Sequence, residues 1–165
     1  LLLSSRFFCK YGPSEKFVAW HQDVTYWGLD SDLAVLAWYA VDDSDADNGC
    51  MRVIPRTHDR VREHGTARQD GNMLSINQEI PVSEAEDRSA VNVELKAGTM
   101  SLHHGCAIHG SLPNRSSRRR CGITSVFLPA HVRQLKKNSF DGYWPAIVVR
   151  GRNRDSNLDL QPHPF

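Results

Sequence analysis

Short runs of strand-forming residues, separated by turn chemistry, constrain the fold of this chain more than any other feature. Turns such as Gly12-Pro13, Ala97-Gly98 and Pro113-Asn114 separate most of the runs, and few stretches have helical character. Many short strands with frequent turns are typical of an all-β sandwich or barrel. At 165 residues the chain is long enough for one domain with a real core.

The expected strands differ in how deeply they should be buried. Leu33 to Val41 is apolar on both faces, which suits a strand buried inside a sandwich. Residues 56–71 are polar and basic and predict a loop with one helical turn, and the polar, Pro-containing tail of 151–165 is expected to lie over the surface. The other expected strands are 5–10, 17–23, 50–54, 72–76, 91–95, 99–104, 106–109, 121–128 and 146–149.

The overall charge excludes some partners. Twenty basic and nineteen acidic residues leave a formal charge of +1, which does not indicate nucleic acid or a membrane surface as a partner. No apolar run reaches transmembrane length, and Leu1 to Leu3 is too short for a signal sequence. We therefore expect a cytoplasmic protein that acts on a small molecule.

One histidine and one carboxylate, two residues apart, form the central motif of the chain. In the sequence Trp20-His21-Gln22-Asp23, an extended backbone places His21 and Asp23 on the same side. A metal that must bind both a substrate and dioxygen needs few protein ligands, and two His with one carboxylate on one face mark non-haem Fe(II) oxygenases. The motif therefore predicts half of a mononuclear iron site.

The third ligand should be a distant histidine, and the candidates are His103, His104 and His109. His109 is favoured because Gly110-Ser111 follows it and Arg120 stands eleven residues on. A turn through Pro113-Asn114 would bring the next strand back antiparallel, so that His109 and Arg120 face one interior. There the arginine fork can hold a carboxylate bidentately.

Three segments together resemble the phytanoyl-CoA dioxygenase family, whose members are Fe(II)- and 2-oxoglutarate-dependent oxygenases on a double-stranded β-helix. The resemblance covers about residues 3 to 130. It implies an all-β jelly-roll, cupin-like fold with few short helices, Fe(II) as cofactor and 2-oxoglutarate as cosubstrate. The segments are 20–27, 42–58 and 102–120, including Asn48-Gly49-Cys50-Met51-Arg52-Val53-Ile54-Pro55 and His109-Gly110-Ser111-Leu112-Pro113-Asn114-Arg115-Ser116.

The resemblance assigns roles to individual residues. His21, Asp23 and His109 match the iron ligands. Arg120 matches the arginine that binds the distal carboxylate of 2-oxoglutarate, Ser111 stands where a hydroxyl often assists it, and Trp38 matches an aromatic residue lining the cosubstrate site. The implied activity is a dioxygenase reaction, most simply hydroxylation of a C–H bond of a small molecule with release of succinate and carbon dioxide.

Family members usually carry a longer N-terminal part, with helices and an upstream lysine that can touch the cosubstrate. The chain begins without Met, inside a strand. We therefore expect residues 1–165 to be a single oxygenase domain that is an N-terminally truncated fragment lacking that lysine. The first strand should then leave apolar side chains bare, namely Leu1 to Leu3, Phe7 and Phe8.

Simpler interpretations stand beside these. The scattered Cys9, Cys50, Cys106 and Cys121 predict reduced, partly buried thiols. The Asp43, Asp45, Asp47 run lacks the glycine and glutamate that an EF-hand requires at positions six and twelve, and so predicts a solvated turn.

Other functions remain as rivals to the oxygenase. A non-catalytic cupin-like binding domain is one alternative. An Fe(II) halogenase is another, which the carboxylate of Asp23 disfavours because such a site needs room for chloride. In the arginine cluster 115–120, we expect Arg120 inside and the others on the surface.

Overall fold

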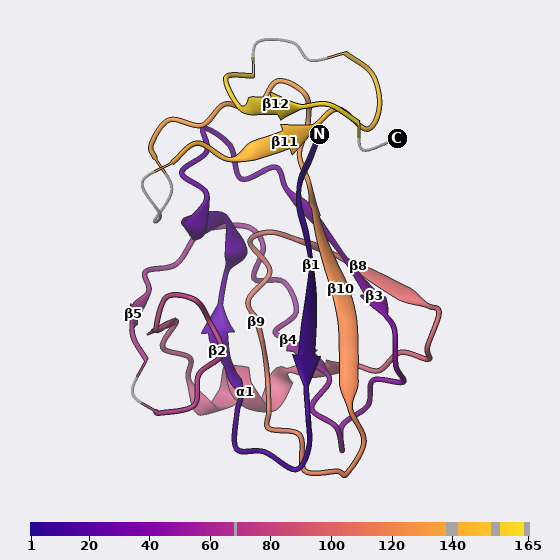
Figure 1. Ribbon diagram of the computed structural model, residues 1–165. Coiled ribbons are helices and arrows are strands. Elements are labelled where there is room, and N and C mark those ends of the chain that lie inside the picture. Colours follow the sequence, from indigo (N-terminus) through magenta and orange to yellow (C-terminus); the bar gives the residue numbers. More distant parts are fainter. Residues whose placement is uncertain (68, 138–141, 153–155, 164–165) are drawn as a thin grey trace.

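The computed structural model describes residues 1–67, 69–137, 142–152 and 156–163, and the regular secondary structure of these residues is almost entirely strand (Figure 1). One sheet has the strand order β12-β11-β1-β10-β3-β8, a second has the order β2-β9-β4-β7, and β5 pairs with β6. The expected all-β, jelly-roll class is confirmed. The strands are β1 Leu2–Lys10, β2 Val18–His21, β3 Val35–Ala40, β4 Met51–Val53, β5 Gly65–Thr66, β6 Gln78–Glu79, β7 Val91–Val93, β8 Met100–His104, β9 His109–Ser111, β10 Arg120–Phe127, β11 Pro145–Ile147 and β12 Asp159–Gln161.

The antiparallel pairing of β1 with β10 and of β10 with β3 forms the centre of the larger sheet. Lys10 pairs with Arg120, and Thr124 pairs with both Arg6 and Trp38. Along β3, Leu36, Trp38 and Ala40 are buried while Val35 and Tyr39 are exposed. The strand therefore has one solvent-facing side, as period-two alternation allows, and the expectation that it is buried on both faces is wrong.

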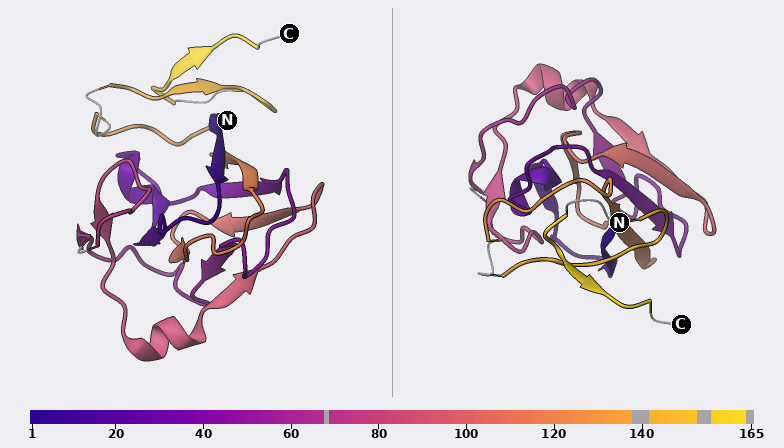
Figure 2. Two further views of the ribbon diagram at one scale, coloured as in Figure 1. Left: turned by 60° about the horizontal axis from the view of Figure 1, so that its bottom comes forward. Right: turned by 90° about the horizontal axis from the view of Figure 1, so that it is seen from above.

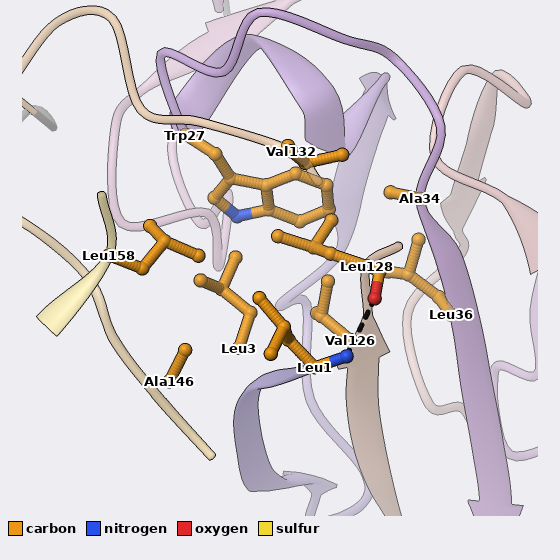
Figure 3. Close-up of a cluster of buried hydrophobic side chains, with 10 residues drawn as sticks. All are labelled: Leu1, Leu3, Trp27, Ala34, Leu36, Val126, Leu128, Val132, Ala146 and Leu158. Carbon is orange, nitrogen blue, oxygen red and sulfur yellow. Dashed lines mark hydrogen bonds between the residues drawn. The ribbon is translucent and has the colours of Figure 1, made fainter. Parts of the chain in front are cut away.

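The main hydrophobic core lies at the end of the molecule where the chain begins (Figure 3). Trp27 packs there with Leu1, Leu3, Val132 and Leu158. Burying one such leucine stabilises the fold by roughly 1.5–3 kcal/mol. The first three residues were expected to be bare, which is wrong for Leu1 and Leu3, each about 5% exposed or less.

The rest of the first strand behaves differently from its start. Phe7 is 69% exposed, as expected, whereas Phe8 is partly buried. Figure 2 shows β11 and β12 crossing the end of the molecule at which β1 begins. The last part of the tail thus supplies Leu158 to the core and a strand to the sheet, in addition to exposed residues.

Several expected boundaries differ from the structure. Residues 72–76 do not form the expected strand. The side chain of Asn72 bonds to Ala19 N and Gln78 O, and these bonds compete with the backbone hydrogen bonds of a regular strand pair. The described part of the 56–71 loop contains no helical turn. A short helix, α1 (Glu84–Ser89), begins instead at a capping box formed by Ser83 and Glu86.

The cysteines fall into two groups. Cys9 and Cys121 lie opposite each other in the β1–β10 ladder and form a disulfide, so the expectation of a reduced thiol is wrong for this pair. The two residues are 112 positions apart, and only the strand register brings them together. Cys50 and Cys106 are free and buried, as expected.

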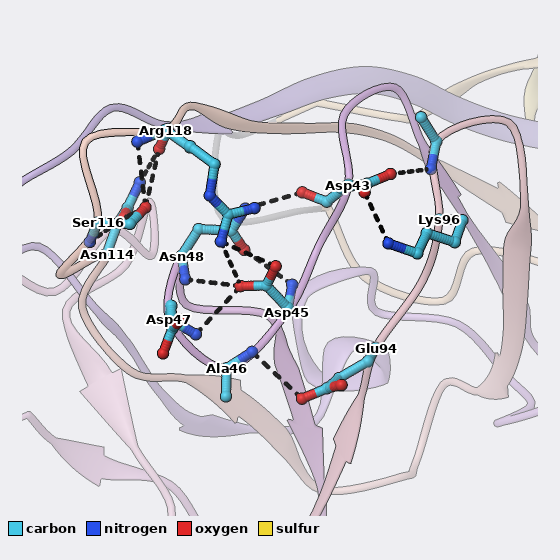
Figure 4. A network of polar contacts seen from close by, with 11 residues as sticks. Asp43, Asp45, Ala46, Asp47, Asn48, Glu94, Lys96, Asn114, Ser116 and Arg118 are labelled. Atoms are coloured by element: carbon cyan, nitrogen blue, oxygen red, sulfur yellow. Dashed lines mark hydrogen bonds and ion pairs between the residues drawn. The ribbon is translucent and has the colours of Figure 1, made fainter.

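The acidic turn after β3 is held together by its own contacts (Figure 4). Asp45 accepts two hydrogen bonds from Arg118 and further bonds from the amides of Asp47 and Asn48, and Asp43 pairs with Lys96. These carboxylates thus pair with cationic side chains and backbone amides, as expected of a solvated surface turn. Among the described residues, the structure has no helix of the length and apolarity needed to cross a membrane.

Candidate active site

Two histidines meet where β2 and β9 pair. His21 ends β2, His109 begins β9, and the two residues are direct partners in the antiparallel register. Their ring centroids are 4.1 Å apart, and both residues are buried. Strand pairing alone therefore brings together two side chains that are 88 positions apart in the sequence.

Asp23 reaches the same point from a short 3₁₀ helix, η1 (Asp23–Tyr26), so the predicted strand 17–23 ends earlier than expected. Gln22 has extended dihedrals, φ −122° and ψ 132°, which keep His21 and Asp23 on one side despite the change of structure. The carboxylate oxygens lie 3.5 Å from His21 Nε2 and 3.4 Å from His109 Nε2. Ligand atoms from these three residues all fall within 4.8 Å of one another.

The backbone of Asp23 is fixed by the turn between β8 and β9. The amides of Asp23 and Val24 both donate to Gly105 O, at 3.0 and 3.4 Å. A Cβ at Gly105 would stand 2.6 Å from Val24 Cγ1. Only a glycine lets this turn approach η1 closely enough to hold the carboxylate in place.

The protons of both imidazoles point away from the carboxylate. His21 Nδ1 and His109 Nδ1 each lie 2.9 Å from a backbone carbonyl, those of Ala19 and Ala107. A carbonyl only accepts, so each Nδ1 carries a proton, and in the neutral ring Nε2 presents a bare lone pair to Asp23.

Burial and neighbouring charges keep His109 and Asp23 free of further protons. Burial lowers the pKa of His109 to about 3. Burial by itself would raise the pKa of Asp23, but His109 and the contact with His21 outweigh it and hold that pKa below the usual range. Asp23 Oδ2 is buried and has no hydrogen-bond partner. A cluster of lone pairs without a donor is suited to a divalent cation.

A second group of polar residues lies nearby, formed by Arg120 of β10, Lys10 of β1 and Ser111 of β9. Arg120 is 2% exposed, and its Nε and Nη2 donate to Gly49 O at 3.1 and 2.6 Å. The guanidinium stacks 4.9 Å from the centroid of the Trp38 ring. Lys10 Nζ donates to Ser111 Oγ at 2.7 Å and also to the carbonyl of Leu112.

Among the described residues, no acidic side chain pairs with these two buried cations. Burial and then the charge of Arg120 lower the pKa of Lys10 to about 7, and burial lowers the pKa of Arg120 to about 10. By contrast, the neighbouring surface arginines pair with carboxylates, Arg118 with Asp45 and Arg119 with Asp42. Buried cations without a carboxylate partner provide a site for an anionic ligand.

The three candidate ligands, and Arg120 with its neighbours Trp38 and Ser111, line one cavity of about 180 Å³ between the two sheets. His21, Asp23 and His109 line it together with Ser111, Trp38 and Arg120, so every predicted site residue borders this cavity. The strand of Arg120 does not lie beside that of His109: β10 belongs to the larger sheet and β9 to the smaller one. The two residues thus face each other across the interior.

Comparison with known proteins agrees with this arrangement. The sequence model of the family described as "Phytanoyl-CoA dioxygenase (PhyH)" matches residues 2–122, well over half of the chain. The chain belongs to the phytanoyl-CoA dioxygenase family.

Within the phytanoyl-CoA dioxygenase family, a curated relative from Arabidopsis thaliana, "Phytanoyl-CoA dioxygenase", is 35% identical over 100 residues, covering 61% of this chain and 34% of the relative. The peroxisomal phytanoyl-CoA dioxygenase of Homo sapiens is 31% identical over 132 residues, covering 78% and 39%. The chain thus spans between a third and two fifths of the length of these two relatives. A solved non-heme monooxygenase, apo ThoJ, superposes with a TM-score of 0.76 at 27% identity, covering 99% of this chain and 57% of that one.

Sequence reasoning missed several residues at this candidate site. Gln22, which lies between the candidate ligands His21 and Asp23, is fully buried, and its amide donates to Cys106 O at 2.6 Å and Arg60 O at 2.8 Å. It therefore anchors the loop after Pro55 to the ligand strand. Lys10, whose ammonium donates to Ser111 Oγ, was not predicted either.

Two further side chains line the cavity without a hydrogen-bond partner. The His103 ring lies 4.9 Å from that of His109, and neither ring nitrogen has a partner. Tyr26 OH is also unpartnered, and burial raises its pKa to about 12. The sequence made His103 a candidate for the third ligand, and the structure places its ring in the cavity wall beside His109.

Proposed function

We propose that residues 1–165 form a single oxygenase domain with Fe(II)- and 2-oxoglutarate-dependent dioxygenase activity, which hydroxylates an unactivated C–H bond of a small molecule and releases succinate and carbon dioxide. The observation that carries this is the presence, in one cavity, of three candidate metal-ligating groups together with the buried guanidinium of Arg120. Lys10 is a second buried cation, and it contacts Ser111 in the wall of that cavity.

The three donors fit a ferrous ion in kind and number. Two imidazole Nε2 atoms and one carboxylate are the ligand set of non-haem Fe(II) oxygenases, which leave positions open for other ligands. The backbone carbonyls of Ala19 and Ala107 orient the rings by accepting from Nδ1. When bound, iron with 2-oxoglutarate and dioxygen supplies the oxidising power for C–H hydroxylation.

The cosubstrate fits the cationic end of the cavity. Arg120 would bind the distal carboxylate of 2-oxoglutarate, with the hydroxyl of Ser111 beside it and Trp38 packed against the guanidinium. Lys10 adds a second positive charge and holds Ser111 Oγ in place. Gly49 O fixes the guanidinium through Nε and Nη2 and leaves Nη1 for a ligand.

The cavity walls favour an apolar reacting group near the metal ligands. Trp27, Leu36, Met51 and Val126 line the space that Asp23 and His109 border. Apolar walls exclude water, which protects a reactive centre and strengthens charge interactions within it. We propose a small-molecule substrate and dioxygen as the partners, and neither nucleic acid nor a membrane.

Two other functions make distinct predictions. A non-catalytic cupin-like binding domain would bind metal without forming succinate. A halogenase would need a small residue in place of the carboxylate ligand, and Asp23 stands within 3.5 Å of both histidines. The geometry therefore supports an oxygenase over a halogenase.

Succinate formation tests the proposal without knowledge of the substrate. Purified protein is incubated with 2-oxoglutarate in air, with Fe(II) or with Mg²⁺ in its place, and succinate is quantified. We expect slow succinate formation with Fe(II) alone, lost in His109→Ala and in Arg120→Ala. Metal binding without any succinate, in the presence of a broad substrate panel, would favour the binding domain. The cytoplasmic location stays a prediction that microscopy of the tagged full-length protein tests.

A further inference from the structure

Arg6 points into the cavity from the middle of β1. Side chains two residues apart share a face of a strand, and Phe8 and Lys10, the next residues on this face, reach the interior. Arg6 pairs in register with Thr124 of β10, whose neighbour on β3 is Trp38. Arg6 and Thr124 both line the cavity, although Arg6 is exposed to solvent at its mouth.

No carboxylate is available to Arg6 inside the cavity. Among the described residues that line it, Asp23 is the only acidic one, and its oxygens face the two histidines. No ion pair joins Arg6 to any described residue, whereas the surface arginines Arg118 and Arg119 both have an aspartate partner. Arg6 is thus a cation on the inner face of a central strand that lacks a counterion.

The position of Arg6 along the strand separates it from the cosubstrate end. Arg6 and Lys10 are four positions apart on β1, a separation of roughly 13 Å at 3.3 Å per residue. Lys10 contacts Ser111, the last residue of β9, and His109 is the first residue of that strand. In Figure 1, β1 runs toward the end where β10 begins, and β2 runs the opposite way. The pairings Val18 with Ser111 and His21 with His109 therefore place the ligands on the Arg6 side of Ser111.

We infer that Arg6 recognises an anionic group of the substrate, a carboxylate or a phosphate, and so orients the apolar part of that molecule toward the metal ligands. This inference rests on the proposed function, because it assumes that Arg120 and Lys10 receive the cosubstrate. The substrate class is then a small organic anion with an aliphatic or aromatic body. The charged end stays near solvent at the mouth, and the body lies against Trp27, Leu36 and Val126.

Binding of matched probes tests the inference. The protein is loaded with Ni²⁺, which does not turn over, and with saturating 2-oxoglutarate. Calorimetry then measures the affinity for two acid–amide pairs of matched shape, octanoate with octanamide and 3-phenylpropionate with its amide. Octyl phosphate is added as a phosphate probe. The same series is run on Arg6→Gln, Arg6→Lys and the control Arg115→Gln, which removes one positive charge from an exposed arginine that does not line the cavity.

We expect the anions to bind wild-type protein about tenfold more tightly than the amides, a difference typical of one charge-assisted hydrogen bond. The preference should disappear in Arg6→Gln, return in part in Arg6→Lys and persist in Arg115→Gln. Equal affinity of acid and amide, an unchanged preference in Arg6→Gln, or no binding by any probe would overturn the inference. Competition between the anions and 2-oxoglutarate would also overturn it.

The proposed function has separate readouts in the same experiment. Binding of Ni²⁺ and of 2-oxoglutarate is measured before any probe is added, and neither should change in Arg6→Gln. If wild-type protein binds neither, the proposed function fails. If both bind but the charge preference does not depend on Arg6, only the further inference fails.

Discussion

At the scale of single residues, the site depends on where protons are and where they are not. His21 and His109 donate hydrogen bonds from Nδ1 to backbone carbonyls, and one carboxylate oxygen of Asp23 has no hydrogen-bond partner. Three lone-pair donors in contact repel one another unless a cation lies between them. The orientation of each donor comes from the backbone, so removing one donor should leave the other two in place.

Replacing a ligand should therefore remove metal binding without unfolding the protein. We expect His21→Ala, Asp23→Ala and His109→Ala each to abolish turnover and to weaken Fe(II) binding sharply, measured by anaerobic Fe(II) titration. His104→Ala is the control, because His104 Nδ1 accepts only from the amide of Cys106. Full Fe(II) affinity in His109→Ala would mean that another histidine is the third ligand.

Arg120 should act on the cosubstrate and not on the metal. Truncating one partner of a buried, hydrogen-bonded charge pair costs roughly 2–5 kcal/mol. We expect Arg120→Ala to raise the 2-oxoglutarate concentration needed for turnover by tens- to thousands-fold while Fe(II) still binds. Arg118→Ala is the matched control, since Arg118 pairs with Asp45 at the surface. Similar losses in both variants would indicate a diffuse surface effect instead.

At the scale of elements, packing between neighbouring strands holds the cosubstrate end in shape. Trp38 of β3 lies against Gly122 of β10, and the same indole stacks on the guanidinium of Arg120. A Cβ at position 122 would overlap the Trp38 ring, with Cε2 and Cη2 at 2.7 Å. The absence of a side chain at Gly122 is thus what lets Trp38 reach Arg120.

Gly122→Ala should displace Trp38 and weaken the site that it supports. Overpacking of a core typically costs about 1–3 kcal/mol, so urea denaturation should show a loss of this size, with weaker 2-oxoglutarate binding. Gly65→Ala is the control, because nothing lies within 4 Å of a Cβ there. A Gly122→Ala protein with unchanged stability and cosubstrate affinity would show that Trp38 is not needed in its present position.

Some of this site could be predicted from the sequence, and the reason is local spacing. The His21 and Asp23 pair depends only on one extended residue between them, so a structural change to η1 did not matter. Lys10 and Arg6 could not be predicted, because their roles follow from register between strands more than a hundred residues apart. The disulfide of Cys9 and Cys121 escaped prediction for the same reason.

Elements were predicted well where patterns were long and poorly where side chains compete with the backbone. β1, β3 and β10 follow from alternating or apolar runs. The helix α1 was not predicted, although Ser83 and Glu86 form a capping box that the sequence contains. The strand expected at 72–76 is absent because the side chain of Asn72 bonds to the backbone of Ala19, Leu74 and Gln78 and competes with strand pairing.

At the scale of the whole molecule, the site imposes a cost on folding. Lys10 is almost fully buried and has only Ser111 Oγ and the Leu112 carbonyl as partners. Burial and then Arg120 lower its pKa to about 7 in the folded protein, against 10.5 as the ordinary value. Between these values the unfolded chain keeps the proton that the folded protein releases, so stability should rise with pH.

This coupling predicts a measurable slope between pH 7.5 and 9. In the ligand-free protein we expect the free energy of unfolding to rise by at most about 1.4 kcal/mol per pH unit, the linkage limit for one proton. The window ends at pH 9 because burial raises the pKa of Cys50 to about 11, which opposes the rise at higher pH.

Urea denaturation at several pH values measures the slope. Lys10→Met should flatten it, whereas Lys16→Met, at an exposed position, should not. Adding 2-oxoglutarate should reduce the slope in wild-type protein, because an anion beside Lys10 favours its charged form. A slope that survives in Lys10→Met would place the titrating group elsewhere in the molecule.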